Sequence, residues 1–201
     1  MNGLLESKCQ ITVQFDKKLE DLKWILNSNE FVLKQEYDIN DVYLVDSSID
    51  LNGDVLDILN NCVLVRNIIN GKNNENRIIY KLKEYGKNQE ITKYEEATCD
   101  VFSVDEAKNF LTVIGYNELM KISDHVFVYT NGIDEFHVQY VNEKYVFIEV
   151  DDHCTFINKT YRDENEIIES LRKYDFPFKD NDYYAKKAVV TFNELYRNSE
   201  E

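Results

Sequence analysis

The stretch "YVFIEVDD", residues 145–152, predicts a β-strand with two unlike faces. Side chains alternate between the two faces of a strand. One face is aliphatic and carries Val146, Ile148 and Val150. The other face begins with aromatic side chains and ends with the carboxylates of Glu149 and Asp151. Such a strand can bury its aliphatic face while it presents two acids side by side on the other.

The residues before this stretch repeat the pattern. Segment 124–152 divides into three expected strands, with Asn131-Gly132 as one turn and Asn142 to Lys144 as the other. Further strands are expected at 4–15, 31–46, 62–69, 77–85 and 90–101. Helical spacing of apolar residues predicts helices at 16–29, 54–61 and 103–116 and in the last fifty residues.

Local signals mark the ends of the expected helices. Asp16 is a plausible N-cap for the first. Ser103 and Glu106 form the spacing of a capping box, and Gly115 is expected to end that helix.

These elements predict an α+β fold, with about eight antiparallel strands in a closed or nearly closed barrel, surrounding helices and a helical C-terminus. The chain has 201 residues, one proline and six glycines, and it shows no linker of biased composition. We therefore expect a single domain over 1–201, with the barrel and its inserted helices in 1–152 and a helical extension in 153–201.

Composition excludes several kinds of partner. The formal net charge is −15, so the overall field disfavours nucleic acid and anionic membranes. The four cysteines, Cys9, Cys62, Cys99 and Cys154, form no CxxC pair, and no histidine stands at zinc-ligand spacing. With no transmembrane stretch and no secretory pattern, we expect a cytoplasmic protein with reduced thiols, and a protein partner stays open.

Charged residues recur on one face of several expected strands. The sets are Glu6, Lys8 and Gln10; Leu64, Arg66 and Ile68; Arg77, Ile79, Lys81 and Lys83; and Lys93, Glu95 and Ala97. Pointing outward, they form an ordinary solvated surface, which general burial statistics favour for any one strand. Pointing inward, they place acids and bases in one cavity. The recurrence, with apolar opposite faces, favours the inward interpretation.

The order of short motifs resembles the CYTH family of triphosphate tunnel metalloenzymes, which includes class IV adenylate cyclases and thiamine triphosphatases. The matching segments are "LLESK" with Glu6 and Lys8, "DVYL" with Asp41 and Tyr43, "VLVR" with Arg66, "IYK" with Lys81, "KYEEA" with Lys93 and Glu95, "VIGY" at 113–116, Glu149 to Asp151, and "FNELY" at 192–196. The resemblance covers nearly the whole chain, in the family's order.

This resemblance implies a triphosphate-containing small molecule held inside the tunnel, with Mg²⁺ or Mn²⁺ as cofactor. It implies Glu6 and Lys8 as catalytic residues. The expected substrate-binding residues are Lys8, Arg66, Lys81 and Lys93, and the neighbouring Arg77 and Lys83 lie on the Lys81 face and can add to them. The implied metal ligands are Glu6, Glu95, Glu149 and Asp151. Lys and Arg suit phosphate oxygens, and carboxylates suit hard cations.

Several positions depart from the family pattern. They are Leu4, Leu64 and Ala97 in the first, third and fifth motifs, Asp124 and Val126 where the family has bases, and Gln139 where it has an aspartate. His137 is a further candidate for the same cavity. Each lost charge-assisted hydrogen bond removes roughly 1.5–3 kcal/mol of binding.

Three functions remain open on the sequence. The first is a divergent metal-dependent enzyme that hydrolyses inorganic triphosphate, thiamine triphosphate or a nucleotide, or that acts as an adenylate cyclase. The second is a catalytically inactive tunnel that binds a phosphorylated ligand or a protein. The third is an acidic α+β scaffold whose charges are purely structural.

Overall fold

The computed structural model describes residues 10–87 and 89–197, and it contains eight strands in that part of the chain. The strands are β1 Gln10–Phe15, β2 Val32–Asp46, β3 Cys62–Asn70, β4 Asn73–Tyr85, β5 Ile91–Asp100, β6 Tyr116–Thr130, β7 Glu135–Val141 and β8 Tyr145–Asp151. The helices are α1 Leu19–Ser28, α2 Val55–Asn60, α3 Val104–Val113, α4 Glu164–Arg172, α5 Lys187–Tyr196 and the 3₁₀ turn η1 Lys179–Asn181. None of the described helices is long and apolar enough to cross a membrane.

The hydrogen-bonded order of the strands is β1-β8-β7-β6-β2-β3-β4-β5. The pairings between them that are resolved are antiparallel. The α+β class and the eight strands are thus confirmed, but the described order has two ends and is open, where a closed or nearly closed barrel was expected. The end strand β5 carries charged, exposed residues on both faces, which is typical of an edge strand.

The chain divides into two compact units. Among the described residues, unit 1 comprises 38–123 and 187–197, and unit 2 comprises 10–37 and 124–186. The long strands β2 and β6 contribute residues to both units. The expected single domain over 1–201 stays a prediction.

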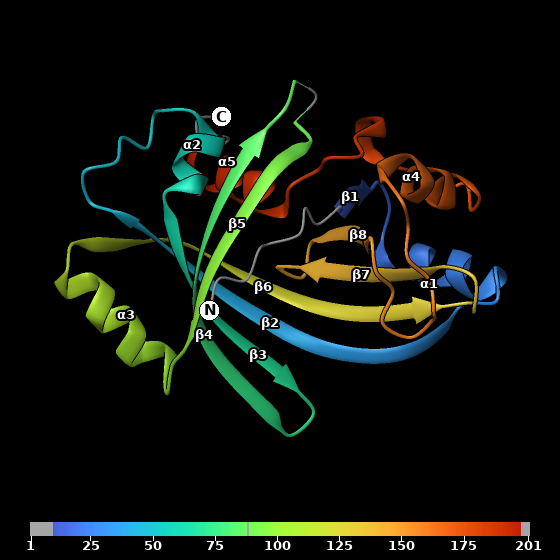
Figure 1. Cartoon of the computed structure of the whole chain (residues 1–201), viewed down its shortest axis with the longest axis horizontal. Helices are drawn as coiled ribbons and strands as arrows, with labels where there is room; N and C mark the ends of the chain where they lie inside the picture. The colour runs from blue at the N-terminus through green and yellow to red at the C-terminus, as the bar shows by residue number, and fades with distance from the viewer. Residues whose placement is uncertain (1–9, 88, 198–201) are drawn as a thin grey trace. The chain divides into compact units, whose positions relative to one another are not determined.

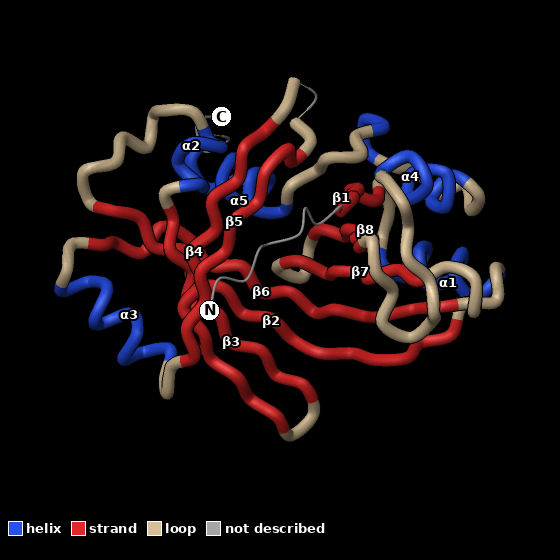
Figure 2. The backbone as a smooth tube through the Cα atoms, viewed as in Figure 1, coloured by secondary structure: helices blue, strands red, loops and turns tan. Residues whose placement is uncertain are grey.

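Unit 1 is built on the β3–β4 hairpin, with β5 paired along β4 (Figures 1 and 2). Gly71 occupies the hairpin turn with a φ of +60°, a region that glycine enters without strain. One face of these strands is apolar and packs under α3. This cluster comprises Val42, Leu44, Val65, Ala107 and Leu111. The apolar face of β3 therefore packs under the helix together with Ile78 of β4, whereas Tyr80 and Leu82 on the same face of β4 are exposed.

Apolar residues are also exposed on α3 and at its ends, among the polar residues of its outer side. Val113 and Phe110 of the helix are exposed, and so are Phe102 before it and Ile114 after it. Phe102 has 91% of its surface exposed and Val113 has 85%. Isolated exposed apolar residues are ordinary, but several around one short helix form a patch of the kind that marks interaction surfaces. We call these four residues the α3 patch.

Unit 2 has the larger core. The aliphatic face of β8 (Val146, Ile148 and Val150) packs with β1, β6 and β7 residues, and this layer is buried together with residues of α1 and α4. The helical contributions are Leu19, Leu22 and Leu26 from α1, and Ile167 and Leu171 from α4. The prediction from "YVFIEVDD" is therefore confirmed for the buried face. Trp24 of α1 lies outside this core and is 70% exposed.

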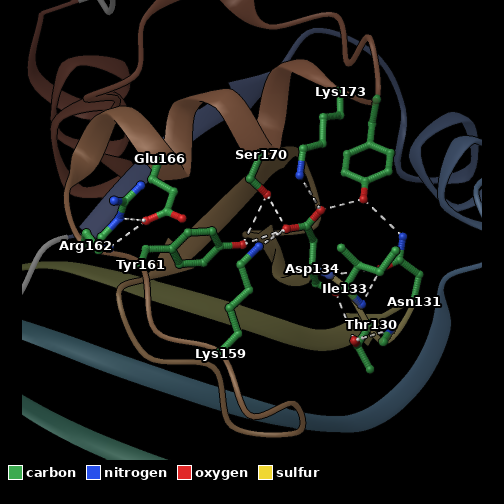
Figure 3. A network of polar contacts seen from close by, with 12 residues as sticks. Thr130, Asn131, Ile133, Asp134, Lys159, Tyr161, Arg162, Glu166, Ser170 and Lys173 are labelled. Atoms are coloured by element: carbon green, nitrogen blue, oxygen red, sulfur yellow. Dashed lines mark hydrogen bonds and ion pairs between the residues drawn. The ribbon is translucent and has the colours of Figure 1, made fainter.

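A buried carboxylate ties the β6–β7 turn to the segment that follows β8. Asp134 has no exposed surface, yet its oxygens accept hydrogen bonds from Tyr161 at 3.0 Å, Ser170 at 2.7 Å and Tyr174 at 2.6 Å. Lys159 pairs with the same carboxylate, and Lys173 lies 3.4 Å from it (Figure 3). We call these six residues the Asp134 network.

The Asp134 network keeps its carboxylate ionised. Burial by itself raises the pKa of an aspartate, but the contacts with Lys159, Tyr174 and Ser170 lower that of Asp134 to about 2. A buried charge that is hydrogen-bonded on several sides becomes costly only when a partner is removed.

Most of the helix caps and turns expected from the sequence are present in the structure. The Ser103 hydroxyl accepts from the backbone N–H of Glu106, and Gly115 follows α3 with a φ of +102°. Asn142 and Glu143 both have positive φ in the β7–β8 turn. The expected N-cap at Asp16 is displaced, because α1 begins at Leu19 after Lys18, whose backbone N–H donates to the Asp21 carboxylate.

Candidate functional site

The charged face of unit 1 is set by strand register. Arg66 of β3 stands opposite Arg77 of β4, and Lys81 of β4 stands opposite Glu96 of β5. Alternation then places Arg66, Lys81 and Glu96 on one face, away from the apolar face under α3. We call this the basic face of unit 1.

Arg66 is held by a buried acid on β2. Its Nε and one terminal nitrogen each donate to the Asp41 carboxylate at 2.7 Å. Asp41 is only 2% exposed, so the pair is bidentate and largely shielded from water. The sequence match had included Asp41 without a role. The structure shows that it fixes the plane of the guanidinium.

Lys81 and Glu96 form the second charged pair of the basic face. Lys81 Nζ lies 3.6 Å from Glu96 Oε2, and the Tyr94 hydroxyl donates to the same carboxylate. Burial would raise the pKa of Glu96, but the Tyr94 hydroxyl, Lys81 and Arg66 together hold it below its ordinary value. Both members of the pair are therefore charged at neutral pH.

The two auxiliary bases, Arg77 and Lys83, lie on the same face as Lys81. Arg77 is paired with Glu75 at 2.7 Å and with Asp100 at 3.1 Å. Lys83 Nζ lies 5.7 Å from the centre of the Tyr94 ring, within reach of a cation–π contact.

Lys93 and Glu95 do not join this face. On β5, Glu96 faces Lys81 and Tyr94 faces Lys83, so the intervening residues point to the opposite side. Lys93 pairs there with Glu84 and Glu95, at 3.3 Å and 2.9 Å. A shift of one residue exchanges the faces of a strand. The residue that the structure brings beside Lys81 is Glu96, where Glu95 was expected.

The acidic end of β8 lies in unit 2, next to a histidine. His137 of β7 stands directly opposite Glu149 of β8, and Asp151 follows on the same face. One ligand atom from each of these three side chains lies within 4.8 Å of the others. Gln10 of β1 donates to the Asp151 carboxylate at 2.9 Å. We call His137, Glu149 and Asp151 the acid–histidine cluster.

A further carboxylate lies beside the histidine, on the same face of β7. Glu135 Oε1 lies 3.5 Å from His137 Nε2, and the backbone N–H groups of Thr155 and Phe156 donate to Glu135 at 2.7 Å and 2.6 Å. Burial by itself lowers the pKa of His137, but the carboxylates of Glu135, Glu149 and Asp151 raise it above its ordinary value.

The acid–histidine cluster fits a divalent cation. At a ligand distance of about 2.1 Å, two ligands of one ion lie at most about 4.2 Å apart, so closing the cluster takes shifts of roughly half an ångström. Two carboxylates and an imidazole are all ordinary ligands for such ions. Glu149 and Asp151, expected as metal ligands, are brought together by the structure, whereas Glu95 belongs to unit 1.

The other residues of the expected site either lie outside the described part of the chain or are mostly buried. Leu4, Glu6 and Lys8 precede the described residues. Leu64 and Val126 are buried apolar side chains, and Gln139 and Asp124 are buried polar ones. By their pairing, Asp124, Val126 and Gln139 share the face of His137. Ala97 lies on the same side of β5 as Lys93.

Sequence reasoning missed three contributors, Glu96, Glu135 and the role of Asp41. Glu135 had one available signal, since it stands two residues before His137 in an expected strand and so shares its face. The motif "KYEEA" offered two adjacent glutamates, and only the pairing with β4 distinguishes them.

The chain has the fold of several solved structures. One is the PH1819 protein from Pyrococcus horikoshii OT3, with 14% identity, a TM-score of 0.64, and coverage of 93% of this chain and 99% of that one. Another is a putative adenylate cyclase from Vibrio parahaemolyticus, with 11% identity, a TM-score of 0.54, and coverage of 92% and 99%. A third is a chain of the Schizosaccharomyces pombe Mediator head module, with 10% identity, a TM-score of 0.50, and coverage of 94% and 96%.

These likenesses confirm the fold that the motif order implied, a fold shared with a putative adenylate cyclase. No protein-family model matches the chain. A search of curated proteins finds no match either. At identities of 10–14% the likeness extends to the fold and not to the activity.

Proposed function

We propose that the protein binds a triphosphate-containing small molecule together with a divalent cation and hydrolyses it. The observation that carries the proposal is the pairing of Glu149 and Asp151 at the end of β8, beside His137, in a group of the size that one cation needs. The likeness to a putative adenylate cyclase supports the same ligand class.

Each unit by itself offers one part of this chemistry. In unit 2, the acid–histidine cluster would hold the cation, which when bound neutralises phosphate charge and orients the attacking water. In unit 1, Arg66 and Lys81 of the basic face are side chains suited to phosphate oxygens. Asp41 keeps the Arg66 guanidinium in a fixed plane, and Glu96 holds the Lys81 ammonium in place, so both donors are positioned before the ligand arrives.

Hydrolysis is tested by product release. The purified chain is incubated with tripolyphosphate, thiamine triphosphate or ATP, with Mg²⁺ or Mn²⁺, and phosphate and pyrophosphate are measured separately. We expect phosphate release that requires the metal and falls by at least about 10–100-fold in Glu149→Gln. Glu169→Gln, an exposed residue of α4, is the matched control. Full turnover in Glu149→Gln would overturn the metal role of Glu149.

The product also separates two chemistries on the same site. A cyclase releases pyrophosphate from ATP and has to hold the nucleoside as well. Pyrophosphate as the product from ATP would replace the hydrolase assignment by a cyclase. The hydrolase is preferred because it requires fewer contacts with the ligand.

The second candidate is an inactive member of the fold that binds a phosphorylated ligand or a protein partner. Two observations favour it. Leu64 and Val126 are buried where the family pattern has bases, and the α3 patch is an exposed apolar surface. The fold also occurs in a chain of the Mediator head module. Binding of tripolyphosphate without release of any product would support this candidate over the enzyme.

We further propose that the protein works in the cytoplasm. The described cysteines, Cys62, Cys99 and Cys154, are free thiols, as a reducing compartment requires.

A further inference from the structure

We propose that His137 is itself a metal ligand, and that the acid–histidine cluster therefore selects a first-row transition-metal dication (Mn²⁺, Co²⁺ or Zn²⁺) over Mg²⁺. The proposal deepens the proposed function, since it concerns the same cation site. It replaces the all-carboxylate site that the sequence implied by a site with one nitrogen and two oxygen ligands.

Strand register makes His137 a neighbour of both acids. His137 and Glu149 are direct partners in the antiparallel β7–β8 pair. Side chains at such positions leave the sheet about 4.5–5.5 Å apart and point the same way. Asp151, two residues further along β8, completes a triangle of ligand atoms within 4.8 Å of one another. No rearrangement of the backbone is needed to bring the ring to the cation.

Glu135 orients the ring as a metal-bound histidine requires. Ligand histidines commonly have the second ring nitrogen facing a carboxylate, which fixes the tautomer and makes the ligating nitrogen more basic. Here Nε2 lies 3.5 Å from the buried Glu135 carboxylate, which is itself held by two backbone N–H groups. Glu135 is thus a fixed partner for Nε2, and Nδ1 remains for the cation.

An orphaned oxygen on the same face also indicates a missing ligand. Gln139 follows His137 by two residues on β7 and is only 4% exposed. Its side-chain oxygen has no hydrogen-bond partner within the described part of the chain. A buried acceptor without a donor costs about 1–3 kcal/mol. Gln139 stands next to the cluster on this face, because its partner on β8 is Phe147, two residues before Glu149.

The ligand set decides which ion is preferred. Mg²⁺ takes oxygen ligands in near-ideal octahedral geometry, and it dehydrates reluctantly. Imidazole nitrogen instead favours the later first-row metals, and affinity rises from Mn²⁺ towards Zn²⁺ and Cu²⁺. A histidine among two carboxylates therefore shifts the site away from Mg²⁺.

The first test detects the nitrogen directly. Mn²⁺ is added to the tag-free full-length chain, and electron spin-echo modulation is recorded for ¹⁴N coupled to the metal. The chain has three histidines, His125, His137 and His153, so the variant H125Q/H153Q leaves His137 alone. We expect nitrogen modulation in the wild type and in H125Q/H153Q, and its loss in H137Q.

Three outcomes would overturn the proposal. They are Mn²⁺ bound without nitrogen modulation in the wild type, modulation that disappears in H125Q/H153Q, and no binding of Mn²⁺ or Co²⁺ at millimolar concentration. The wild type and H125Q/H153Q decide the matter even where H137Q fails to fold.

The second test measures selectivity by calorimetry, without substrate. We expect H137Q to weaken Co²⁺ binding at least about tenfold, while Mg²⁺ binding changes less. H125Q is the matched control, because His125 pairs with Tyr140 on the opposite face of the sheet. Equal losses for Co²⁺ and Mg²⁺ would overturn the proposal. If the metal has a nitrogen ligand but no phosphate is released, this proposal stands and the hydrolase assignment falls. If phosphate is released but the metal has no nitrogen ligand, the hydrolase assignment stands and this proposal falls.

Discussion

The two units use charge on their polar sheet faces in opposite ways. In unit 1 the bases stand beside acids, with Arg66 on Asp41 and Lys81 near Glu96. In unit 2 two carboxylates stand together beside His137, and a third carboxylate, Glu135, lies next to the Nε2 atom of the same ring. A ligand anion at unit 1 therefore competes with acids already in place, whereas a cation at unit 2 relieves repulsion between acids.

The comparison teaches that neighbouring opposite charges and neighbouring like charges serve different ends. Paired bases are rigid and pre-oriented, which lowers the entropy lost on binding. Clustered acids store unfavourable electrostatic energy that a cation can release. The same difference sets the effect of mutations, because removing one member of a buried pair leaves the other uncompensated.

Arg66→Ala is expected to cause the largest loss. It leaves the Asp41 carboxylate buried without its bidentate partner, and the free energy of unfolding of unit 1 should fall by about 3–5 kcal/mol. Urea unfolding gives the magnitude, and hydrogen exchange in β2 and β3 peptides locates it. The exposed Arg162→Ala should cost less than about 1 kcal/mol. A loss that small for Arg66→Ala would show that the pair contributes nothing to stability.

Asp134→Asn should have the next largest effect, and it should fall on unit 2. The amide keeps the size of the side chain but cannot neutralise Lys159, and it replaces several charge-assisted hydrogen bonds by weaker ones. We expect a loss of about 2–3 kcal/mol, measured by urea unfolding. Asp16→Asn, in an exposed loop of the same unit, is the control. Equal stabilities of the two variants would contradict the prediction.

Acid should remove the contribution of Asp134 in a defined range. The pKa of Asp134 is lowered from 3.8 to about 2 in the folded chain, so the unfolded chain binds its proton first as the pH falls. The stabilisation is complete above about pH 4 and is lost between about pH 4 and pH 2. It amounts to roughly 2 kcal/mol. Unfolding curves of the wild type should converge on those of Asp134→Asn over this range.

The smallest effects are expected for single lysines of β4 and β5. Lys81→Ala should weaken tripolyphosphate binding about tenfold, since it removes one charge-assisted contact. Lys93→Ala, on the opposite face, should change it by less than about twofold, with little change in stability. Isothermal titration of the two variants side by side decides between the faces. A larger loss in Lys93→Ala would mean that β5 presents Glu95 and not Glu96 to the ligand.

The fold of unit 2 could be predicted because its strands are strongly two-sided. In β8 the aliphatic residues alternate without interruption. The β6–β7 turn contains a glycine and the β7–β8 turn an asparagine, two residue types that accept a positive φ. The same alternation placed Glu149 and Asp151 on one face correctly. What alternation could not show is which residue of β7 stands across from Glu149, since that depends on the register between strands.

The face of β5 could not be predicted for a related reason. Both of its faces are polar and partly exposed, so burial does not choose between Glu95 and Glu96 in the sequence. The choice is made by pairing with β4, where the register shifts between Glu84 and Tyr85. Asp41 and Asp134 escaped prediction because their partners lie 25 or more residues away along the chain.

The Asp134 network also constrains the order in which the chain can be completed. Its partners follow Asp134 by 25 to 40 residues, from Lys159 to Tyr174. A growing chain whose β6–β7 hairpin has just left the ribosome therefore holds a carboxylate whose partners have not yet emerged, and water has to solvate it until they do. Because contacts of high sequence separation form late, closure of unit 2 belongs to the last stage of folding, after translation has passed α4.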